Sequence, residues 1–195
     1  MNEFEETEEK ITDDVSETAD IEDLPDDPAR EAADYARSFG FDKAADYIER
    51  HYDGDDFDPC MPIPISTRNM DLEGKEAENG VPFERRTAQL TDGLEVEGVF
   101  PVFDSFHHVE LGEDAKDLSL YQQFDACKKD FQDNLYEDVD LSAFTIGDME
   151  RMEDSLGFAP EGYTWQHNPE TGSFDLVSSD DHSVGHTGGN ALWGK

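Results

Sequence analysis

Two runs of alternating apolar and polar residues, separated by Asp92-Gly93, constrain the fold more than any other stretch. The runs read VPFERRTAQL (81–90) and LEVEGVFPVF (94–103). Alternation with a period of two is typical of half-buried strands, and an Asp-Gly pair between two such runs favours a tight hairpin. The sequence therefore predicts an antiparallel strand pair over residues 81–103.

Helical patterns lie on both sides of this hairpin. Residues 27–56 predict a small helical hairpin, because Asp27 can cap a first helix, Pro28 suits its first turn and Gly40 ends its apolar spacing. A second short helix should follow and end near His51. Such a piece buries little by itself, so we expect it to dock on the main domain or on a partner.

Two further helices are expected after the strands. Residues 117–138 carry Leu120, Phe124, Cys127, Phe131 and Leu135 at steps of three and four, and residues 140–158 have a similar but shorter pattern. With the strands these patterns predict an α+β domain. Residues 52–66 are acidic and then Pro-rich and are expected to be a linker. The predicted division is 1–27, an acidic tail; 28–59, a helical hairpin and linker; and 60–195, the main domain.

Acidic residues dominate the chain, which has 195 residues and a formal net charge of −36. Residues 1–58 alone carry 22 Asp or Glu against 5 Lys or Arg. The first 27 residues have little to bury and much like charge to repel, so they are expected to be disordered. Three interpretations of the acidity stay open: a solvated tail, a mimic of nucleic-acid phosphates, and adaptation to salt.

The chain shows neither a Sec-type signal nor a run of eighteen apolar residues, so we expect a protein made in the cytoplasm without a membrane partner. Cys60 and Cys127 lie far apart and neither has a CxxC spacing. Two free thiols in a reducing compartment are therefore expected, rather than a disulfide or a zinc site.

Three of the six histidines occur in the segment GYTWQHNPETGSFDLVSSDDHSVGHTGG (162–189). Its composition predicts a strand, a turn, a second strand and a short helix, with His167 at the end of the first strand. His182 and His186 are four apart and would share one helical face, a spacing that suits two metal ligands. His167 could then take a proton from water. The alternative is that these are loop histidines without a role.

The remaining histidines are expected to be structural or solvated. His51 stands alone at the end of a short helix, and His107 and His108 are adjacent in a strand, where neighbouring side chains point to opposite faces.

The same segment resembles the C-terminal signature of WHH-type HNH nucleases, the toxin domains of bacterial polymorphic toxin systems with the ββα-metal (His-Me finger) fold. The likeness extends upstream to RNMDLEGKEAENGVPFERRTAQLTDGLEVEGVFPVFDS (68–105) and to QFDACKKDF (123–131), and it covers roughly residues 60–195. The resemblance implies a ββα-metal motif at the C-terminal end of a small mixed domain.

The resemblance also implies roles for individual residues. His167 matches the second histidine of the Trp-His-His signature and would be the general base, while His182 and His186 would bind one divalent ion: Zn, Ni, Mg or Mn. Gln166 stands where the family has its first histidine, and an amide oxygen is a weaker ligand than imidazole for a transition metal. Supporting roles are expected for Gln166, Asn168, Asp175 and Asp181. Phosphate contacts are expected from Arg85, Arg86, Lys128 and Lys129.

These expectations lead to a metal-dependent endonuclease, acting on DNA in preference to RNA, that serves as an antibacterial toxin. The resemblance implies a nucleic-acid substrate, a cognate immunity protein, and a secretion adaptor or chaperone at the N-terminal region. It also implies export by a specialised system and action in the cytoplasm of a target cell. The alternative is a weak or inactive binding or regulatory protein on a degenerate HNH scaffold, because Gln166 replaces a family histidine.

Overall fold

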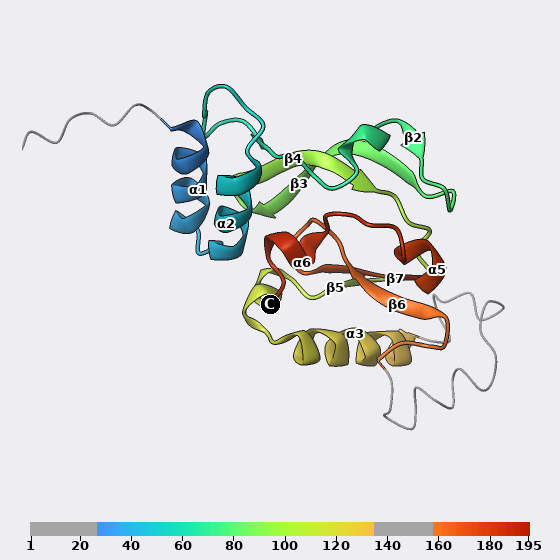
Figure 1. Ribbon diagram of the computed structural model, residues 1–195. Coiled ribbons are helices and arrows are strands. Elements are labelled where there is room, and N and C mark those ends of the chain that lie inside the picture. Colours follow the sequence, from blue (N-terminus) through green and yellow to red (C-terminus); the bar gives the residue numbers. More distant parts are fainter. Residues whose placement is uncertain (1–26, 135–157) are drawn as a thin grey trace, which may run out of the picture.

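The structure, a computed structural model, describes residues 27–134 and 158–195 as a mixed α+β domain with two sheets (Figure 1). The α+β prediction is confirmed. The helices are α1 (Pro28–Ser38), α2 (Asp42–His51), α3 (Leu120–Asn134), α5 (Ser179–His182) and α6 (Gly189–Leu192), with 3₁₀ turns η1 (Met70–Leu72) and η2 (Glu113–Asp117). The strands are β1 (Ile63–Pro64), β2 (Lys75–Glu76), β3 (Pro82–Thr91), β4 (Leu94–Pro101), β5 (His107–Glu110), β6 (Tyr163–His167) and β7 (Ser173–Ser178).

The first sheet has the order β1-β4-β3-β2 and is built around the predicted hairpin. Strands β3 and β4 pair antiparallel from Phe83↔Pro101 to Thr91↔Leu94, and Gly93 takes the left-handed conformation with φ of 83°. An Asp-Gly turn suits this position because glycine enters that region without a steric cost. The hairpin prediction is confirmed.

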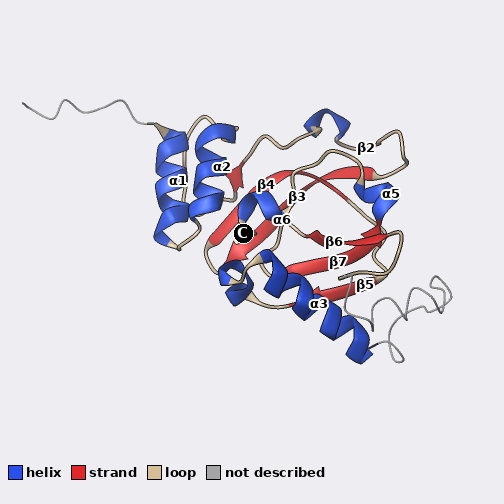
Figure 2. Ribbon diagram, turned by 60° about the horizontal axis from the view of Figure 1, so that its bottom comes forward, coloured by secondary structure: helices blue, strands red, loops and turns tan. Residues whose placement is uncertain are grey.

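The second sheet has the order β5-β7-β6 and is antiparallel throughout. Helix α3 lies along this sheet in both views (Figures 1 and 2). Its Cys127 and Phe131 are fully buried, as their helical spacing predicts. Leu120 is 42% exposed, because it occupies the first position of the helix, where the chain has only begun to follow the sheet.

Helices α1 and α2 form the predicted hairpin. Asp27 Oδ1 accepts from the Arg30 amide at 3.3 Å, as an N-cap does, and Gly40 with φ of 81° ends α1. Alanines line the faces that meet, so the helices approach closely: Ala32, Ala33, Ala36, Ala44 and Ala45 are all fully buried. They share one hydrophobic cluster with both sheets, so the hairpin docks on the rest of the chain.

Part of the expected linker is structured. Within residues 52–66, Ile63 and Ile65 are buried and Ile63 pairs with Val96 in a parallel bridge. An alternation of isoleucine and proline suits a short edge strand, where proline leaves no ladder donor missing. The tail at 1–26 and most of the helix expected at 140–158 lie outside the described residues. Among the helices of the described ranges, none has the length and apolar character needed to span a membrane.

Candidate functional site

Strand β6, strand β7 and helix α5 place three histidines of the C-terminal segment. The strands pair antiparallel, and α5 begins directly after β7, where Ser178 caps it by accepting from the amides of Asp180 and Asp181. The chain thus has the predicted order of strand, turn, strand and short helix. Helix α5 ends at His182, however, so His186 lies in the following loop and the pair does not share a helical face. The loop folds back, and the two imidazole centroids are 5.0 Å apart.

The Gln166 side chain lies between these two rings. Its Oε1 is 2.6 Å from His182 Nε2 and 3.1 Å from His186 Nε2. The amide group is oriented by its own Nε2, which donates to the carbonyl of His167 at 2.8 Å. An amide oxygen and two imidazole nitrogens therefore converge on one point.

The position of the proton on the His186 ring determines whether its Nε2 can donate to the Gln166 oxygen. His186 Nδ1 lies 2.8 Å from the Val184 carbonyl and must donate to it, since a carbonyl only accepts. Burial, the largest cause, lowers the pKa of His186, and the ring is therefore neutral near pH 7. A neutral ring with the proton on Nδ1 carries a lone pair on Nε2, which then faces the Gln166 oxygen. Two facing acceptors repel, and a cation bound by both atoms would remove this repulsion.

His182 is neutral as well, and its Nε2 can donate to the Gln166 oxygen. Burial, followed by the neighbouring His186, lowers the pKa of His182 to about 4, so neither ring supplies a positive charge near neutral pH. The donor set fits a divalent ion, because imidazole nitrogen and amide oxygen are both metal ligands and the His186 Nδ1–H bond to a carbonyl is typical of ligating histidines. Within residues 27–134 and 158–195, no group of three or more His, Cys, Asp or Glu is placed to hold a metal ion.

Glycines of the GHTGG sequence (185–189) allow the loop to reach this point. A Cβ on Gly188 would lie 2.9 Å from Gln166 Nε2 and 3.0 Å from the His167 carbonyl, closer than side chains tolerate. Thr187 ties the loop to distant elements: its Oγ1 accepts from the Arg68 amide at 3.0 Å and lies 2.9 Å from the Tyr47 hydroxyl of α2.

His167, the residue after Gln166 in β6, is buried at 6% exposure. Its Nε2 is 2.9 Å from Gln123 Oε1, and Gln123 Nε2 donates to the carbonyls of Ala115 and Leu118, which turns the Gln123 oxygen toward the ring. His167 therefore carries its proton on Nε2 and a lone pair on Nδ1. Burial, then Lys43 and His182, lowers the pKa of His167 to about 4, which keeps the ring neutral at pH 7.

The expected supporting residues lie around, rather than in, the convergence point. Asp175 accepts from Ser105, pairs with His108 and accepts from Asn168, forming a network of its own. The Asn168 carbonyl accepts from Trp193 Nε1, which fixes the residue after β6. Asp181 offers its main-chain carbonyl to Asn79.

The four expected phosphate contacts are engaged elsewhere. Arg85 pairs with Glu73 and Glu97, Arg86 with Glu170, and Lys129 with Asp125, while Lys128 is buried at 8% exposure; none of the four lines the histidine pocket defined below. The cations nearest the histidines are Lys43 and Arg68, which influence His167 and His186 respectively. Neither Lys43 nor Arg68 was among the expected contacts, because no sequence spacing links residues so distant along the chain.

A pocket of ≈ 570 Å³ opens over these groups, and we call it the histidine pocket. Its lining includes Lys43, Gln166, His167, His182, His186 and Asn190. Among the described residues no Asp or Glu lines it, although the chain has 50 acidic residues. A polyanion can therefore approach here without meeting a carboxylate in the lining.

The other histidines have structural contacts. His51 stacks on Tyr47, His107 Nε2 is 2.7 Å from Asp130, and the exposed His108 lies between Asp175 and Glu110. His107 and His108 point to opposite faces of β5, as predicted, with side chains 8% and 52% exposed. Both cysteines are free thiols, as expected.

Comparison with known proteins identifies the segment that carries this site. Residues 92–188 match the family model described as the DNase/tRNase domain of colicin-like bacteriocin. The match spans β6, β7, α5 and all three histidines of the pocket. Searches of curated proteins and of solved structures gave no match. The match supports the resemblance to a nuclease toxin domain at the level of a colicin-like DNase/tRNase domain, over residues 92–188.

Proposed function

We propose that the chain is a metal-dependent endonuclease of the WHH-type HNH group, with a ββα-metal site, that acts as an antibacterial toxin. The observation that carries the proposal is the convergence of Gln166 Oε1, His182 Nε2 and His186 Nε2, with two facing lone pairs whose repulsion a bound cation would remove. The family match supports the nuclease class.

Gln166, His182 and His186 would hold the metal ion. Two imidazoles favour zinc or nickel over magnesium or manganese, since nitrogen donors suit the later transition ions. When bound, such an ion supplies positive charge at a scissile phosphate and its leaving oxygen. The Val184 carbonyl, which accepts from His186 Nδ1, holds that ring in the tautomer that binds metal.

His167 acts as the general base in this proposal. With Nε2 donating to Gln123, its Nδ1 is the nitrogen free to accept a proton from water. Gln123 is a positioning residue, because its two bonds to main-chain carbonyls prevent the amide from turning and offering a donor to the ring. Because burial lowers the pKa of His167 to about 4, the ring is unprotonated throughout the neutral range, although burial also makes it a weaker base.

DNA is the substrate we favour, with RNA as the second choice. Nucleic-acid affinity comes largely from cations at phosphates. Lys43 lines the histidine pocket, whose described lining has no carboxylate, and Arg68 acts on the charge of His186. Arg85, Arg86, Lys128 and Lys129 would contact phosphates only farther along a strand. Asn168, Asp175 and Asp181 support the two strands and the helix.

The same proposal includes the biology of such toxins. A cognate immunity protein protects the producing cell, a secretion adaptor or chaperone engages the N-terminal region, and the toxin reaches the target-cell cytoplasm through a specialised system. The colicin-like match supports an immunity partner in general.

A second candidate rests on Gln166 itself. An amide oxygen in place of imidazole weakens a transition-metal site. If metal binding is lost, the chain is a binding or regulatory protein on an inactive HNH scaffold.

Cleavage of supercoiled plasmid tests the proposal. The purified chain is incubated with Zn²⁺, Ni²⁺, Mg²⁺ or Mn²⁺, beside the variants His167→Ala and His186→Ala. We expect nicking with at least one ion and a loss of rate of about 100-fold or more in either variant. His51→Ala is the matched control, since His51 lies outside the histidine pocket.

Metal binding by calorimetry separates the two candidates. Binding that disappears in His182→Ala and His186→Ala, together with cleavage, supports the enzyme. Absence of cleavage of DNA and RNA with every ion would leave the inactive-scaffold candidate, whereas undiminished metal binding in the double variant would rule out this site.

A further inference from the structure

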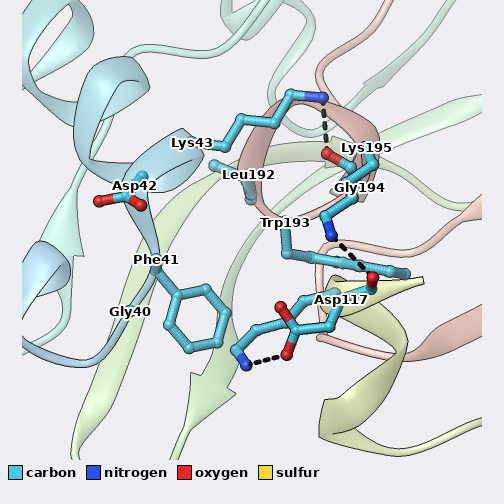
Figure 3. A pocket seen from close by; sticks show the side chains of 10 residues that line it. Gly40, Phe41, Asp42, Lys43, Asp117, Leu192, Trp193, Gly194 and Lys195 are labelled. Carbon is cyan, nitrogen blue, oxygen red and sulfur yellow. Dashed lines mark hydrogen bonds and ion pairs between the residues drawn. The ribbon is translucent and has the colours of Figure 1, made fainter. Parts of the chain in front are cut away.

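A second hollow, of ≈ 220 Å³, lies beside the histidine pocket and is lined by lysines from three parts of the chain (Figure 3). Lys43 comes from the first turn of α2, Lys116 from η2, and Lys195 from the segment after α6. We call this hollow the lysine pocket.

Each ammonium group in the lysine pocket is held at one bond and has donors to spare. Lys43 Nζ donates to the Gly194 carbonyl at 2.6 Å, and Lys195 Nζ donates to the Asp117 carbonyl at 2.7 Å. Lys116 pairs with the Asp117 carboxylate at 2.9 Å. An ammonium has three N–H donors, so each keeps two for a further acceptor. In the described part of the chain, Lys43 and Lys195 have no ion-pair partner.

Lysines outnumber carboxylates in the lining of the lysine pocket, although the whole chain has 14 basic against 50 acidic residues. Three lysines face Asp42 and Asp117 there. Asp117 is already paired with Lys116, and this hydrogen bond raises the pKa of Lys116 and lowers that of Asp117. Glu113 and Asp114 also act on Lys116, so Lys43 and Lys195 are the lining cations on which a further anion would rely.

The lysine pocket lies next to the histidine pocket. Lys43 lines both, and consecutive residues of one segment form the wall between them: Asn190 and Ala191 on one side, and Leu192 to Lys195 on the other. Trp193 is buried at 3% in this wall, and its ring centroid lies 5.2 Å from that of His167. A strand whose reacting phosphate lies near His167 would pass Lys43 on its way to Lys116 and Lys195.

We infer that the lysine pocket is a subsite for a backbone phosphate of the nucleic-acid strand next to the one that is cut. This inference rests on the proposed nuclease function and adds to it the path of the nucleic-acid strand across the protein. Lysine suits such a contact, because a compact ammonium binds phosphate as a point charge and positions the strand without reading its sequence.

The test measures binding of a short fluorescein-labelled DNA duplex by anisotropy, in EDTA so that no cleavage occurs, over a series of salt concentrations. Lys116→Gln with Lys195→Gln removes two charges from the lysine pocket. The matched control, Arg50→Gln with Lys75→Gln, removes two charges elsewhere; each of these side chains also donates to a main-chain carbonyl. Thermal melts of both double variants verify folding.

We expect the slope of log affinity against log salt to fall in magnitude by about 1 to 2 in K116Q/K195Q, and to stay unchanged in R50Q/K75Q. Equal slopes in the two double variants, or a wild type that binds no nucleic acid, would overturn the subsite. Failure of the nuclease proposal looks different, since a reduced slope without cleavage under any metal leaves the subsite in place. Conversely, cleavage with equal slopes leaves the nuclease and removes the subsite.

Discussion

Gln166 is the residue that distinguishes the active-nuclease candidate from the inactive-scaffold candidate. Its oxygen faces both His182 and His186, so replacing it with an imidazole would supply a third nitrogen donor at the same point. We expect Gln166→His to tighten binding of Zn²⁺ or Ni²⁺ by about tenfold or more and to increase nicking of supercoiled DNA. Calorimetry measures the first effect and gel electrophoresis the second.

Gln89→His is the control for this substitution, because Gln89 is also a strand glutamine but is exposed on β3. It should change neither quantity. If Gln166→His leaves both metal affinity and cleavage at wild-type values, Gln166 is not at a ligand position, and the geometry of the three groups needs another explanation.

The two thiols should differ sharply in reactivity. Cys127 is fully buried, and burial raises the pKa of its thiol to about 12, so almost no thiolate forms near neutral pH. Cys60 is exposed. We expect DTNB to label Cys60 alone in the folded protein and both cysteines in denaturant, with Cys60→Ser abolishing the native signal. Rapid labelling of the folded Cys60→Ser variant would contradict the buried position of Cys127.

Residue types and their spacing predicted several residues of the candidate site, but not all of them. His182 and His186 could be selected because they are four positions apart in the sequence, and they do meet. The reason given was incomplete, since α5 is too short to hold both and the glycines of the loop bring His186 back. Lys43 could not be found this way: the docking of α2 on the C-terminal segment places it there, and that contact has no local signature.

At the scale of elements, the sequence predicted correctly those strands and helices that pack against a neighbour in the chain. The β3–β4 hairpin and the α1–α2 hairpin each join neighbours through a short turn whose glycine has a positive φ. The β1 strand was taken for linker, because its parallel partner β4 lies some thirty residues away and two residues are too few for periodicity. Long-range pairing of this kind depends on the whole fold.

The second sheet should show a pH-dependent stability through His108, which joins β5 to Asp175 of β7. Burial lowers the pKa of His108, but hydrogen bonds to Asp175 and Glu110 outweigh it and the net pKa is raised. A raised pKa means that protonation favours the folded state. The contribution is therefore full below the unfolded pKa of about 6.5 and is lost as pH rises through the higher folded value.

The variant His108→Gln keeps a hydrogen-bonding side chain and removes the titration. Chemical denaturation should show wild type to be more stable than His108→Gln at about pH 5.5, with the difference shrinking toward about pH 8.5. Because His108 is half exposed, the difference should be modest. A difference that is constant with pH, or that grows at high pH, would show that Asp175 and Glu110 do not stabilise the charged ring.

At the scale of the whole molecule, we expect residues 1–26 to be removable without loss of the core, because their sequence offers little apolar surface to bury. We expect the thermal melts of the full chain and of the chain lacking residues 1–26 to coincide nearly. Removing Asp27 as well deletes the α1 N-cap and should cost about 1 kcal/mol. A large loss on removal of residues 1–26 alone would mean that this segment binds the domain, which would favour the phosphate-mimic interpretation.

Because the chain is so highly charged, salt should change its stability and its affinity for nucleic acid in opposite directions. With a net charge of −36, like charges repel across the folded chain, and salt screens them over a Debye length that falls from about 30 Å at 0.01 M to about 3 Å at 1 M. We expect the melting temperature to rise steadily with NaCl over this range, while affinity for nucleic acid falls because phosphate contacts release counterions.

The chain without residues 1–26 has lost 12 acidic residues and one lysine, so its melting temperature should rise less with salt. KCl should reproduce the NaCl curve, since screening depends on ionic strength. A melting temperature that is flat or falls with salt would show that the acidic side chains are spaced widely enough not to repel, and adaptation to salt would then lose its physical basis.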